Sequence, residues 1–363
     1  MLLEVDDLSV SYRTGHDVVR AVRGISFAID AGETLAMAGE SGSGKSTVAL
    51  SLLRLLPPSA QVSGAIRFRG DDLLTANWAA LRAVRWADAS IVFQGAMSAL
   101  NPVRSIGEQI REPILLHSKV GERTARERTA ALLDSVGVSS RRARSYPHEL
   151  SGGQRQRVMI AMALACDPDL IIADEPTTAL DVIVQAQILT LLADLVRDSH
   201  IGMIFISHDL SVLAQACDRL AVMYAGRIVE IGPSRALIDR PRHPYTRALG
   251  AAFPRIGDPA SRLAPTGLAG DPPDLRAELP GCAFAPRCPV SMAACRDHEI
   301  ALWPAGAPPG EAALDGDPAS RRSACLRVLP EFAGVPAQSQ PGEPSELADL
   351  AEEPRADDVR TTR

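Results

Sequence analysis

The chain has 363 residues, of which 46% are hydrophobic, so it is too long for one ordinary domain and has the composition of a globular protein. Its net charge of −6 gives no reason to expect nucleic acid as the main partner. No apolar run approaches the roughly 20 residues needed to cross a bilayer, and the N-terminus lacks the basic and apolar regions of a signal peptide. We therefore expect an intracellular protein that reaches a membrane only through partners.

Alternating apolar residues predict short strands near the N-terminus, among them 8–12 and 22–29. The mostly apolar run 33–38 also has strand length, and the run 48–53 is typical of a buried helix. Between these two lies the segment 39–47, with the sequence Gly-Glu-Ser-Gly-Ser-Gly-Lys-Ser-Thr. A strand, a glycine-rich turn ending in Gly-Lys-Ser, and a helix are the context of a phosphate-binding P-loop.

This segment predicts a nucleoside triphosphate site. Its glycines let backbone N–H groups turn toward phosphates, and the helix start that follows favours negative charge. The Lys45 ammonium would reach the β- and γ-phosphates, and the Ser46 hydroxyl would bind Mg²⁺. The residues of this segment that we expect to contact ATP or its metal ion are Gly39, Ser41, Gly42, Gly44, Lys45, Ser46 and Thr47.

The middle of the chain predicts a helical lobe. Short strands are expected over 64–70 and 91–94, and the second of these ends in Gln94. Isoleucines then recur at a helical spacing from position 106, and an Arg- and Glu-rich helix follows over 121–136. We expect these helices to form a separate subdomain over about residues 95–168.

Strand character returns after the helical lobe. The runs 170–173 and 203–206 are apolar and are separated by a long amphipathic helix over 182–197, and the segments 220–224 and 227–231 predict a hairpin. Strands that alternate with helices indicate an α/β fold with a mainly parallel sheet.

Two acids follow the strand 170–173. A strand buried on both faces holds the side chains at its carboxyl end rigidly beside the P-loop. We expect Asp174 to hold Mg²⁺, directly or through water, and Glu175 to act as general base on the attacking water.

The segment 150–154, Leu-Ser-Gly-Gly-Gln, opens a further helix. Ser151 is a good N-cap, so helix initiation alone would explain it. The consecutive glycines Gly152 and Gly153 exceed what a cap needs, and they predict a second anion-binding helix start.

At this point the chain resembles the ATP-binding subunits of ABC transporters, because their motifs occur in family order over about the first 250 residues. The matching features are the adenine-stacking Tyr12, the Walker A segment 39–47, the Q-loop Gln94, the signature with Ser151, Gly152, Gly153 and Gln154, the Walker B strand 170–175, the D-loop with Asp181, and the switch His208. The resemblance implies a P-loop NTPase domain of the ABC ATPase type over 1–253, with a mainly parallel sheet, antiparallel N-terminal strands and a helical subdomain.

The resemblance also implies roles for residues that carry little signal alone. Gln94 would contact Mg²⁺ and the attacking water, and His208 would hydrogen-bond the γ-phosphate. Ser151, Gly152, Gly153 and Gln154 would close over ATP bound to the P-loop of a second subunit. One copy of each motif per chain therefore implies a dimer of ATPase domains.

The composition changes near residue 254. The segment 254–330 is rich in Pro, Gly and Ala and predicts a small irregular domain, and 331–363 predicts a disordered acidic tail. Four of the six cysteines, Cys282, Cys288, Cys295 and Cys325, lie in the first of these segments. In a reducing compartment this grouping favours a staple made by a metal, either a Cys₄ zinc site or an iron–sulfur cluster, over a disulfide or free thiols.

The C-terminal half narrows the resemblance to dipeptide and oligopeptide importers. The segments 242–249 and 280–289 and the stretch 97–102 resemble segments of that subfamily, although Gly95 and Ala96 replace its usual Asp-Pro. The resemblance implies a [4Fe–4S] cluster at the four cysteines, structural or sensing in role, with Zn²⁺ as the alternative.

We therefore expect an ATPase subunit at the cytoplasmic face of the cell membrane that powers uptake of di- and oligopeptides. The implied partners are a second, related ATPase chain, two integral-membrane permeases and an extracytoplasmic substrate-binding protein. The same subfamily serves nickel, glutathione and other small solutes, which is one alternative. A second alternative is a soluble ABC ATPase that acts in DNA repair, translation or cluster assembly. Proteins of that class often have paired ATPase domains, coiled coils or basic arms, and none of these occurs in the sequence.

Overall fold

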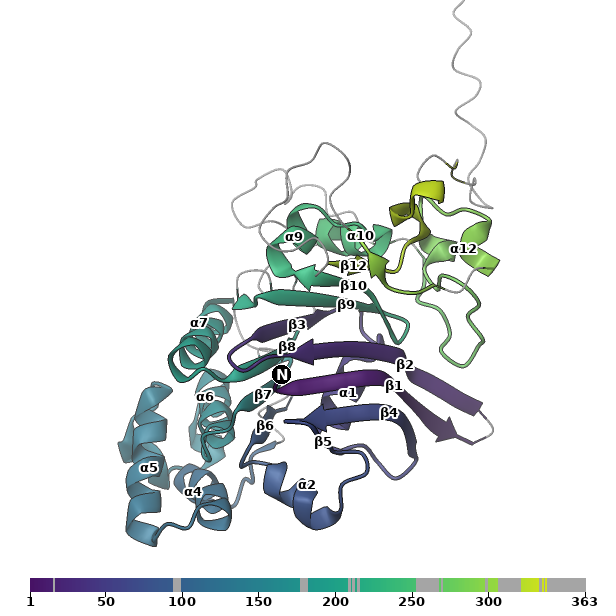
Figure 1. Ribbon diagram of the computed structural model, residues 1–363. Helices are drawn as coiled ribbons and strands as arrows, with labels where there is room; N and C mark the ends of the chain where they lie inside the picture. Colours follow the sequence, from purple (N-terminus) through teal and green to yellow (C-terminus); the bar gives the residue numbers. More distant parts are fainter. Residues whose placement is uncertain are drawn as a thin grey trace, which may run out of the picture.

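The computed structural model describes residues 1–15, 17–93, 99–176, 182–207, 216–252, 270–297, 300–305 and 321–332, and the single positions 210, 213, 268, 335 and 337. Two sheets and a helical lobe make up this part of the chain (Figure 1). None of the described helices combines the length and the apolar character that a transmembrane span requires.

A four-stranded antiparallel sheet forms the N-terminal part, in the order β2-β1-β4-β5. Its strands are β1 (Leu3–Thr14), β2 (Asp17–Ile29), β4 (Ala60–Phe68) and β5 (Asp71–Asp72). Alternating residues of β1, such as Leu3, Val5, Leu8 and Val10, are buried against the main sheet and helix α1. The predicted antiparallel strands are thus confirmed.

The main sheet has eight strands in the order β11-β12-β10-β9-β3-β8-β7-β6. Five neighbouring strands at one end of this order are parallel and nearly fully buried, because the antiparallel sheet and α1 pack on one face and helices pack on the other. They are β3 (Thr34–Ala38), β6 (Ala89–Val92), β7 (Leu170–Asp174), β8 (Gly202–Ile206) and β9 (Arg219–Tyr224). The predicted hairpin is confirmed: β9 pairs antiparallel with β10 (Arg227–Pro233) around Ala225 and Gly226, both at positive φ.

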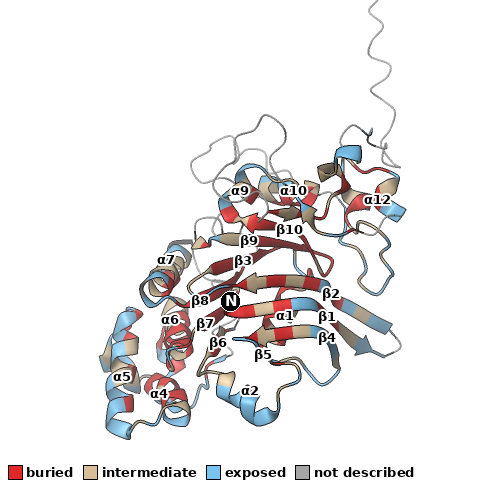
Figure 2. Cartoon of the chain, viewed as in Figure 1, coloured by how far each residue is buried: buried red, intermediate tan, exposed pale blue. Residues whose placement is uncertain are grey.

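Three helices form the predicted helical lobe, α4 (Ile106–His117), α5 (Glu122–Ser135) and α6 (Gly152–Ala163). Their apolar faces meet around Ile110, Leu133 and Ile160, all fully buried, while the outer face of α5 is exposed (Figure 2). The other α-helices in the described part of the chain are α1 (Lys45–Leu52), α2 (Trp78–Val84), α7 (Val182–Ser199), α9 (Ser234–Asp239), α10 (Pro244–Ala252) and α12 (Ala294–Asp297).

The cysteine-containing region continues the main sheet. Its strands β11 (Trp303–Pro304) and β12 (Arg322–Ser323) extend the sheet beyond β10, where Ser323 pairs with Glu230. The Glu230 carboxylate is fully buried and accepts hydrogen bonds from the Arg321 guanidinium and from the N–H groups of Arg242 and His243. The small irregular C-terminal fold was predicted, whereas its place in the sheet was not, and the boundary at 253/254 stays a prediction.

Candidate nucleotide-binding site

The P-loop connects β3 to α1 in the predicted order. Gly39 and Gly44 have φ of 153° and 102°, where side chains are strained. A Cβ at Gly39 would lie 2.2 Å from the Met223 carbonyl oxygen, and one at Gly44 would lie 2.3 Å from that of Ala21. Glycine is therefore required at both ends of the loop because the backbone of neighbouring strands passes too close for a side chain.

Lys45 lies under this loop and is only 5% exposed. Its Nζ donates to the carbonyl oxygens of Gly39 and Glu40, at 2.8 and 2.9 Å, and to Ser43 Oγ at 3.2 Å. Burial lowers the pKa of the Lys45 ammonium, while the charges of Glu175, Asp174 and Glu40 oppose that shift. The loop thus holds a buried cation at its centre, as a triphosphate site requires.

Ser46 and Asp174 come together from positions 128 residues apart. Ser46 Oγ donates to Asp174 Oδ1 at 3.1 Å, where β7 ends beside the start of α1. Burial raises the pKa of the Asp174 carboxyl, and the hydrogen bond from Ser46 opposes that shift. A hydroxyl beside a carboxylate is the donor set that P-loop proteins use for Mg²⁺.

Glu175 follows Asp174 at the same sheet edge. Its φ is 44°, an uncommon value for a side-chain-bearing residue, and its N–H donates to the Ile206 carbonyl oxygen at 3.0 Å. The negative charge of its carboxylate raises the pKa of the Lys45 ammonium, against the effect of burial. Asp174 and Glu175 therefore lie beside the P-loop, as predicted.

Tyr12 reaches the P-loop helix from β1. Its hydroxyl donates to Thr47 Oγ1 at 3.3 Å, and its side chain is half-buried. Ser41 and Gly42 are exposed on the P-loop itself. Tyr12 thus lies beside Thr47, and the ATP contacts of Tyr12, Ser41, Gly42 and Thr47 stay predictions.

The signature lies in the helical lobe, at the start of α6. Ser151 Oγ accepts from the Gln154 N–H, and Gln154 Oε1 accepts from the Ser151 N–H, so the two residues form a capping box. A Cβ at Gly153 would lie 2.6 Å from Val184 Cγ1, so any side chain at this position would displace Val184. Within the described residues, the hydrogen bonds of Ser151 and Gln154 remain in the lobe and do not reach this chain's own P-loop.

Three predicted site residues, Gln94, Asp181 and His208, lie outside the described residues. Their predicted roles therefore rest on the sequence.

Two residues that the sequence did not mark contact the P-loop at Glu40. The Tyr245 hydroxyl, on fully buried Tyr245 of α10, accepts from the Glu40 N–H at 2.8 Å. Arg287, next to Cys288, pairs with both oxygens of the Glu40 carboxylate, at 2.9 and 3.0 Å. The Arg287 side chain is 6% exposed and also donates to the Tyr224 hydroxyl at 3.2 Å. Both residues lie within segments that the sequence analysis singled out, but only the fold brings those segments to the P-loop.

The four C-terminal cysteines line a single cavity of about 20 Å³. Burial raises the pKa of Cys282 to about 12 and that of Cys325 to about 11, and it also raises the pKa of Cys288. The Cys282 N–H donates to the Cys295 carbonyl oxygen at 2.7 Å. Among the described residues, no group of three or more His, Cys, Asp or Glu side chains is arranged to hold one metal ion.

Comparison with known families matches two parts of this chain. Residues 22–178 match the ABC transporter family, and residues 229–295 match the C-terminal region of oligopeptide/dipeptide transporters. The first match contains the P-loop, the signature and Asp174, and the second contains Tyr245 and Arg287.

Similar proteins agree with both matches. The chain is 47% identical, over 81% of its length and 88% of the relative's, to the dipeptide transport ATP-binding protein DppD of Bacillus subtilis. It is 43% identical, over 92% of its length and 95% of the relative's, to the oligopeptide transport ATP-binding protein OppD of Salmonella typhimurium. A dimeric post-hydrolysis structure of the ATP-binding cassette MJ0796, bound to ADP and phosphate, superposes with a TM-score of 0.59 at 27% identity, covering 64% of this chain and 99% of that one.

The fold and the nucleotide site define an ABC ATPase. More specifically, the chain belongs to the ATP-binding subunits of oligopeptide and dipeptide ABC transporters. The prediction drawn from the sequence motifs is confirmed at both levels.

Proposed function

We propose that this subunit hydrolyses ATP to power the import of di- and oligopeptides through membrane partners. The observation that carries the proposal is the contact between Ser46 and Asp174 beside buried Lys45, within a chain of the peptide-transporter family. Mg²⁺, when bound between Ser46 and Asp174, would neutralise charge on the phosphates. Lys45 would leave the loop carbonyls for the β- and γ-phosphate oxygens, which exchanges neutral acceptors for charged ones.

Glu175 would orient the attacking water and accept its proton. Its position immediately after Asp174, at the carboxyl end of β7, supports this role. Gln94 and His208 would complete the site from the Q-loop and from the end of β8, and Tyr12 would stack on the adenine.

The signature residues would act on a second subunit. The capped start of α6 holds the signature in the helical lobe, and the hydrogen bonds of Ser151 and Gln154 do not reach this chain's P-loop within the described residues. Ser151, Gly152, Gly153 and Gln154 would therefore contact a partner's nucleotide, and Asp181 of the D-loop would join them. Two such sites would close on ATP and reopen after hydrolysis, because ATP and ADP favour different states. A dimeric solved relative supports this assembly. The second ATPase would be a related, non-identical chain.

The membrane partners would be two permeases, with an extracytoplasmic substrate-binding protein presenting the peptide. This places the subunit at the cytoplasmic face of the membrane, attached through the permeases. Relatives named for dipeptide and oligopeptide transport support peptides as the solute, and transport assays with nickel and glutathione would test the alternatives.

The test uses Glu175→Gln in the complex purified with its membrane subunits. We expect ATP binding to persist while turnover falls at least about 100-fold and the ATPase pair stays closed, because the base is lost and the phosphate contacts remain. Glu127→Gln, on the exposed face of α5, is the matched control and should turn over like the wild type. Normal turnover by Glu175→Gln would show that Glu175 is not the base.

We also propose that Cys282, Cys288, Cys295 and Cys325 bind a [4Fe–4S] cluster. Four thiols bordering one cavity supply the complete ligand set of such a cluster. The cavity of about 20 Å³ has the space of one water molecule, so the thiols must move apart to accept a cluster. The cluster, when bound, would hold the four segments together as a staple.

Metal analysis of the anaerobically purified protein tests this second proposal. We expect about four iron atoms per chain with broad visible absorbance, both lost in Cys288→Ser. Cys217→Ser, at a buried cysteine outside this cavity, is the matched control and should keep the iron. One zinc and no iron would replace the cluster with a Cys₄ zinc site, and a metal-free protein would overturn both.

A further inference from the structure

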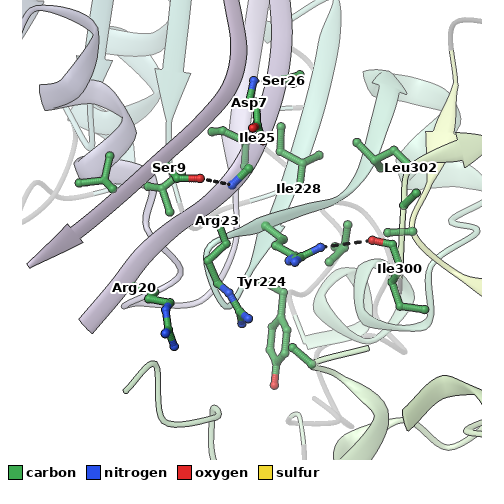
Figure 3. Close-up of a pocket in the computed structure, with 18 of the residues that line it drawn as sticks. Asp7, Ser9, Arg20, Arg23, Ile25, Ser26, Tyr224, Ile228, Ile300 and Leu302 are labelled. Carbon is green, nitrogen blue, oxygen red and sulfur yellow. Dashed lines mark hydrogen bonds between the residues drawn. The ribbon is translucent and has the colours of Figure 1, made fainter. Parts of the chain in front are cut away.

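A second, larger cavity lies between the antiparallel sheet, the β9–β10 hairpin and the cysteine region (Figure 3). Its volume is about 850 Å³, within the range of small-molecule sites. Neither Tyr12 nor any residue of 39–47 lines it. The cavity is therefore separate from the residues predicted to contact ATP.

The walls of this cavity are strongly basic. Four arginines line it, and Asp7 is the one acidic residue among the described lining residues. The arginines come from three separate parts of the chain: Arg20 and Arg23 from β2, Arg227 from β10, and Arg322 from β12. Arg20 and Arg23 extend in the same direction, with Tyr224 beside them (Figure 3).

These positive charges are poorly compensated by the described residues. Arg20 has one carboxylate partner, exposed Glu278, at 4.0 Å. Arg227 donates to the carbonyl oxygen of Ile300 at 3.3 Å, and within the described part of the chain neither Arg23 nor Arg322 has a carboxylate partner. Burial is the main cause that lowers the pKa of Arg23, and the positive charges of Arg227 and Arg20 lower it further. Like charges are thus held together in a partly buried wall.

We propose that this cavity binds a small organic polyanion that carries carboxylate or phosphate groups. Guanidinium forks match both groups through paired hydrogen bonds, and four arginines lining one space suit a ligand with more than one negative charge. The hydroxyls of Ser9, Ser11 and Tyr224 add polar contacts, while Ile228, Leu302 and Phe284 supply an apolar wall for a carbon skeleton.

The site is close to the P-loop without being part of it. The Arg23 N–H donates to the Gly226 carbonyl oxygen at 2.8 Å, and the Gly226 N–H donates to the Ser43 carbonyl oxygen at 3.1 Å. A ligand on Arg23 therefore lies two backbone hydrogen bonds from the nucleotide loop. Cys282 borders both this cavity and the small cysteine cavity, so the ligand would also touch the cysteine region.

Isothermal titration of the full-length protein tests the proposal with two probes. Tricarballylate carries only carboxylates and phosphoglycolate also carries a phosphate, so their relative affinities identify the preferred group. The P-loop is first saturated with a non-hydrolysable ATP analogue, and uncharged glycerol is the control ligand. We expect saturable binding of at least one probe, weakened by salt.

Arg23→Gln and Arg227→Gln should each weaken probe binding about tenfold or more, because each removes a charged hydrogen-bond donor. Arg82→Gln, on exposed α2, is the matched control and should bind like the wild type. Affinity for the ATP analogue, measured in every variant, should stay unchanged and reports on folding. The proposal is overturned if neither probe binds saturably while the ATP analogue occupies the P-loop, or if the cavity variants bind as tightly as the wild type.

Discussion

The P-loop and the cysteine cavity handle charge in opposite ways. In the P-loop, Lys45 is buried but keeps three oxygen acceptors and the nearby carboxylates of Glu175 and Asp174. In the cysteine cavity, burial raises the pKa of Cys282 and Cys325, so their thiols are neutral near pH 7. The P-loop carries the positive charge of Lys45 before a ligand binds. The cysteine cavity becomes negatively charged only when a metal ion replaces the thiol protons.

The difference shows how each site is made specific. A preformed cation in a loop of fixed backbone selects phosphate through geometry that exists without the ligand. A set of neutral thiols does not attract anions, and it binds strongly only to a soft metal centre. Arg287 connects the two sites, because it adjoins Cys288 and pairs with Glu40 of the P-loop.

The largest expected effect is on the preformed site. Lys45→Ala should lower ATP affinity by more than about 100-fold, since it removes the buried cation that faces the phosphates. The chain's other lysine, exposed Lys119, provides the control Lys119→Ala. Equilibrium binding of a fluorescent ATP analogue measures both, and wild-type affinity in Lys45→Ala would refute the assignment of the P-loop. Cys288→Ser should change this affinity far less than Lys45→Ala.

An intermediate effect is expected where the two sites meet. Arg287→Gln leaves the Glu40 carboxylate, only 23% exposed, without its paired guanidinium, which should destabilise the protein by about 1–3 kcal/mol and weaken ATP binding several-fold. Denaturant unfolding and ATP titration measure the two losses.

Arg276→Gln is the control for this change, because Arg276 pairs with Asp274 on the exposed surface of the same region and should cost less than about 0.5 kcal/mol. The double variant Glu40→Gln/Arg287→Gln should recover part of the stability. If the stability losses of the single variants Glu40→Gln and Arg287→Gln simply add in the double variant, then this ion pair does not couple the P-loop to the cysteine region.

The smallest effect concerns pH and the metal-free thiols. A thiol whose pKa is raised by folding stabilises the native state below its unfolded pKa, and this contribution is lost as the pH rises toward the folded value. Because burial raises the pKa of Cys282 from 9.0 to about 12, this thiol should cost the metal-free protein about 1 kcal/mol of stability between about pH 8 and about pH 10. The Cys282→Ser variant should lose less stability than the wild type over the same pH range, as measured by unfolding. The metal-loaded protein should behave in the reverse way and lose stability toward acid, because protons then compete for thiolates.

Features that depend on local pattern were predicted well. The strand before the P-loop, the capped start of α6 at Ser151 and the helices of the lobe follow from apolar spacing and from caps, which act within a few residues. The acids Asp174 and Glu175 were placed correctly because parallel strands bring their carboxyl ends to one edge.

Features that depend on distant pairing were not predicted. Strands β11 and β12 have two residues each, which is too short for any periodicity to show. Arg287 and Glu40 are 247 residues apart, and an arginine in a Pro-rich segment carries no signal for a P-loop contact. The basic cavity was missed for the same reason, since its arginines come from β2, β10 and β12 and the chain as a whole is acidic.

The pairing of β12 with β10 has a consequence for how the chain is synthesised. The ribosome releases the P-loop early, but Tyr245 and Arg287, which fix Glu40, emerge much later, and Ser323, which covers the edge of β10, emerges later still. The nascent chain therefore exposes the P-loop, the signature and Glu175 before Glu40 has its contacts with Tyr245 and Arg287. The edge of β10 is also open at that stage and could pair with another chain. Completion of the C-terminal region is thus the step that fixes Glu40 of the P-loop and covers the edge of β10.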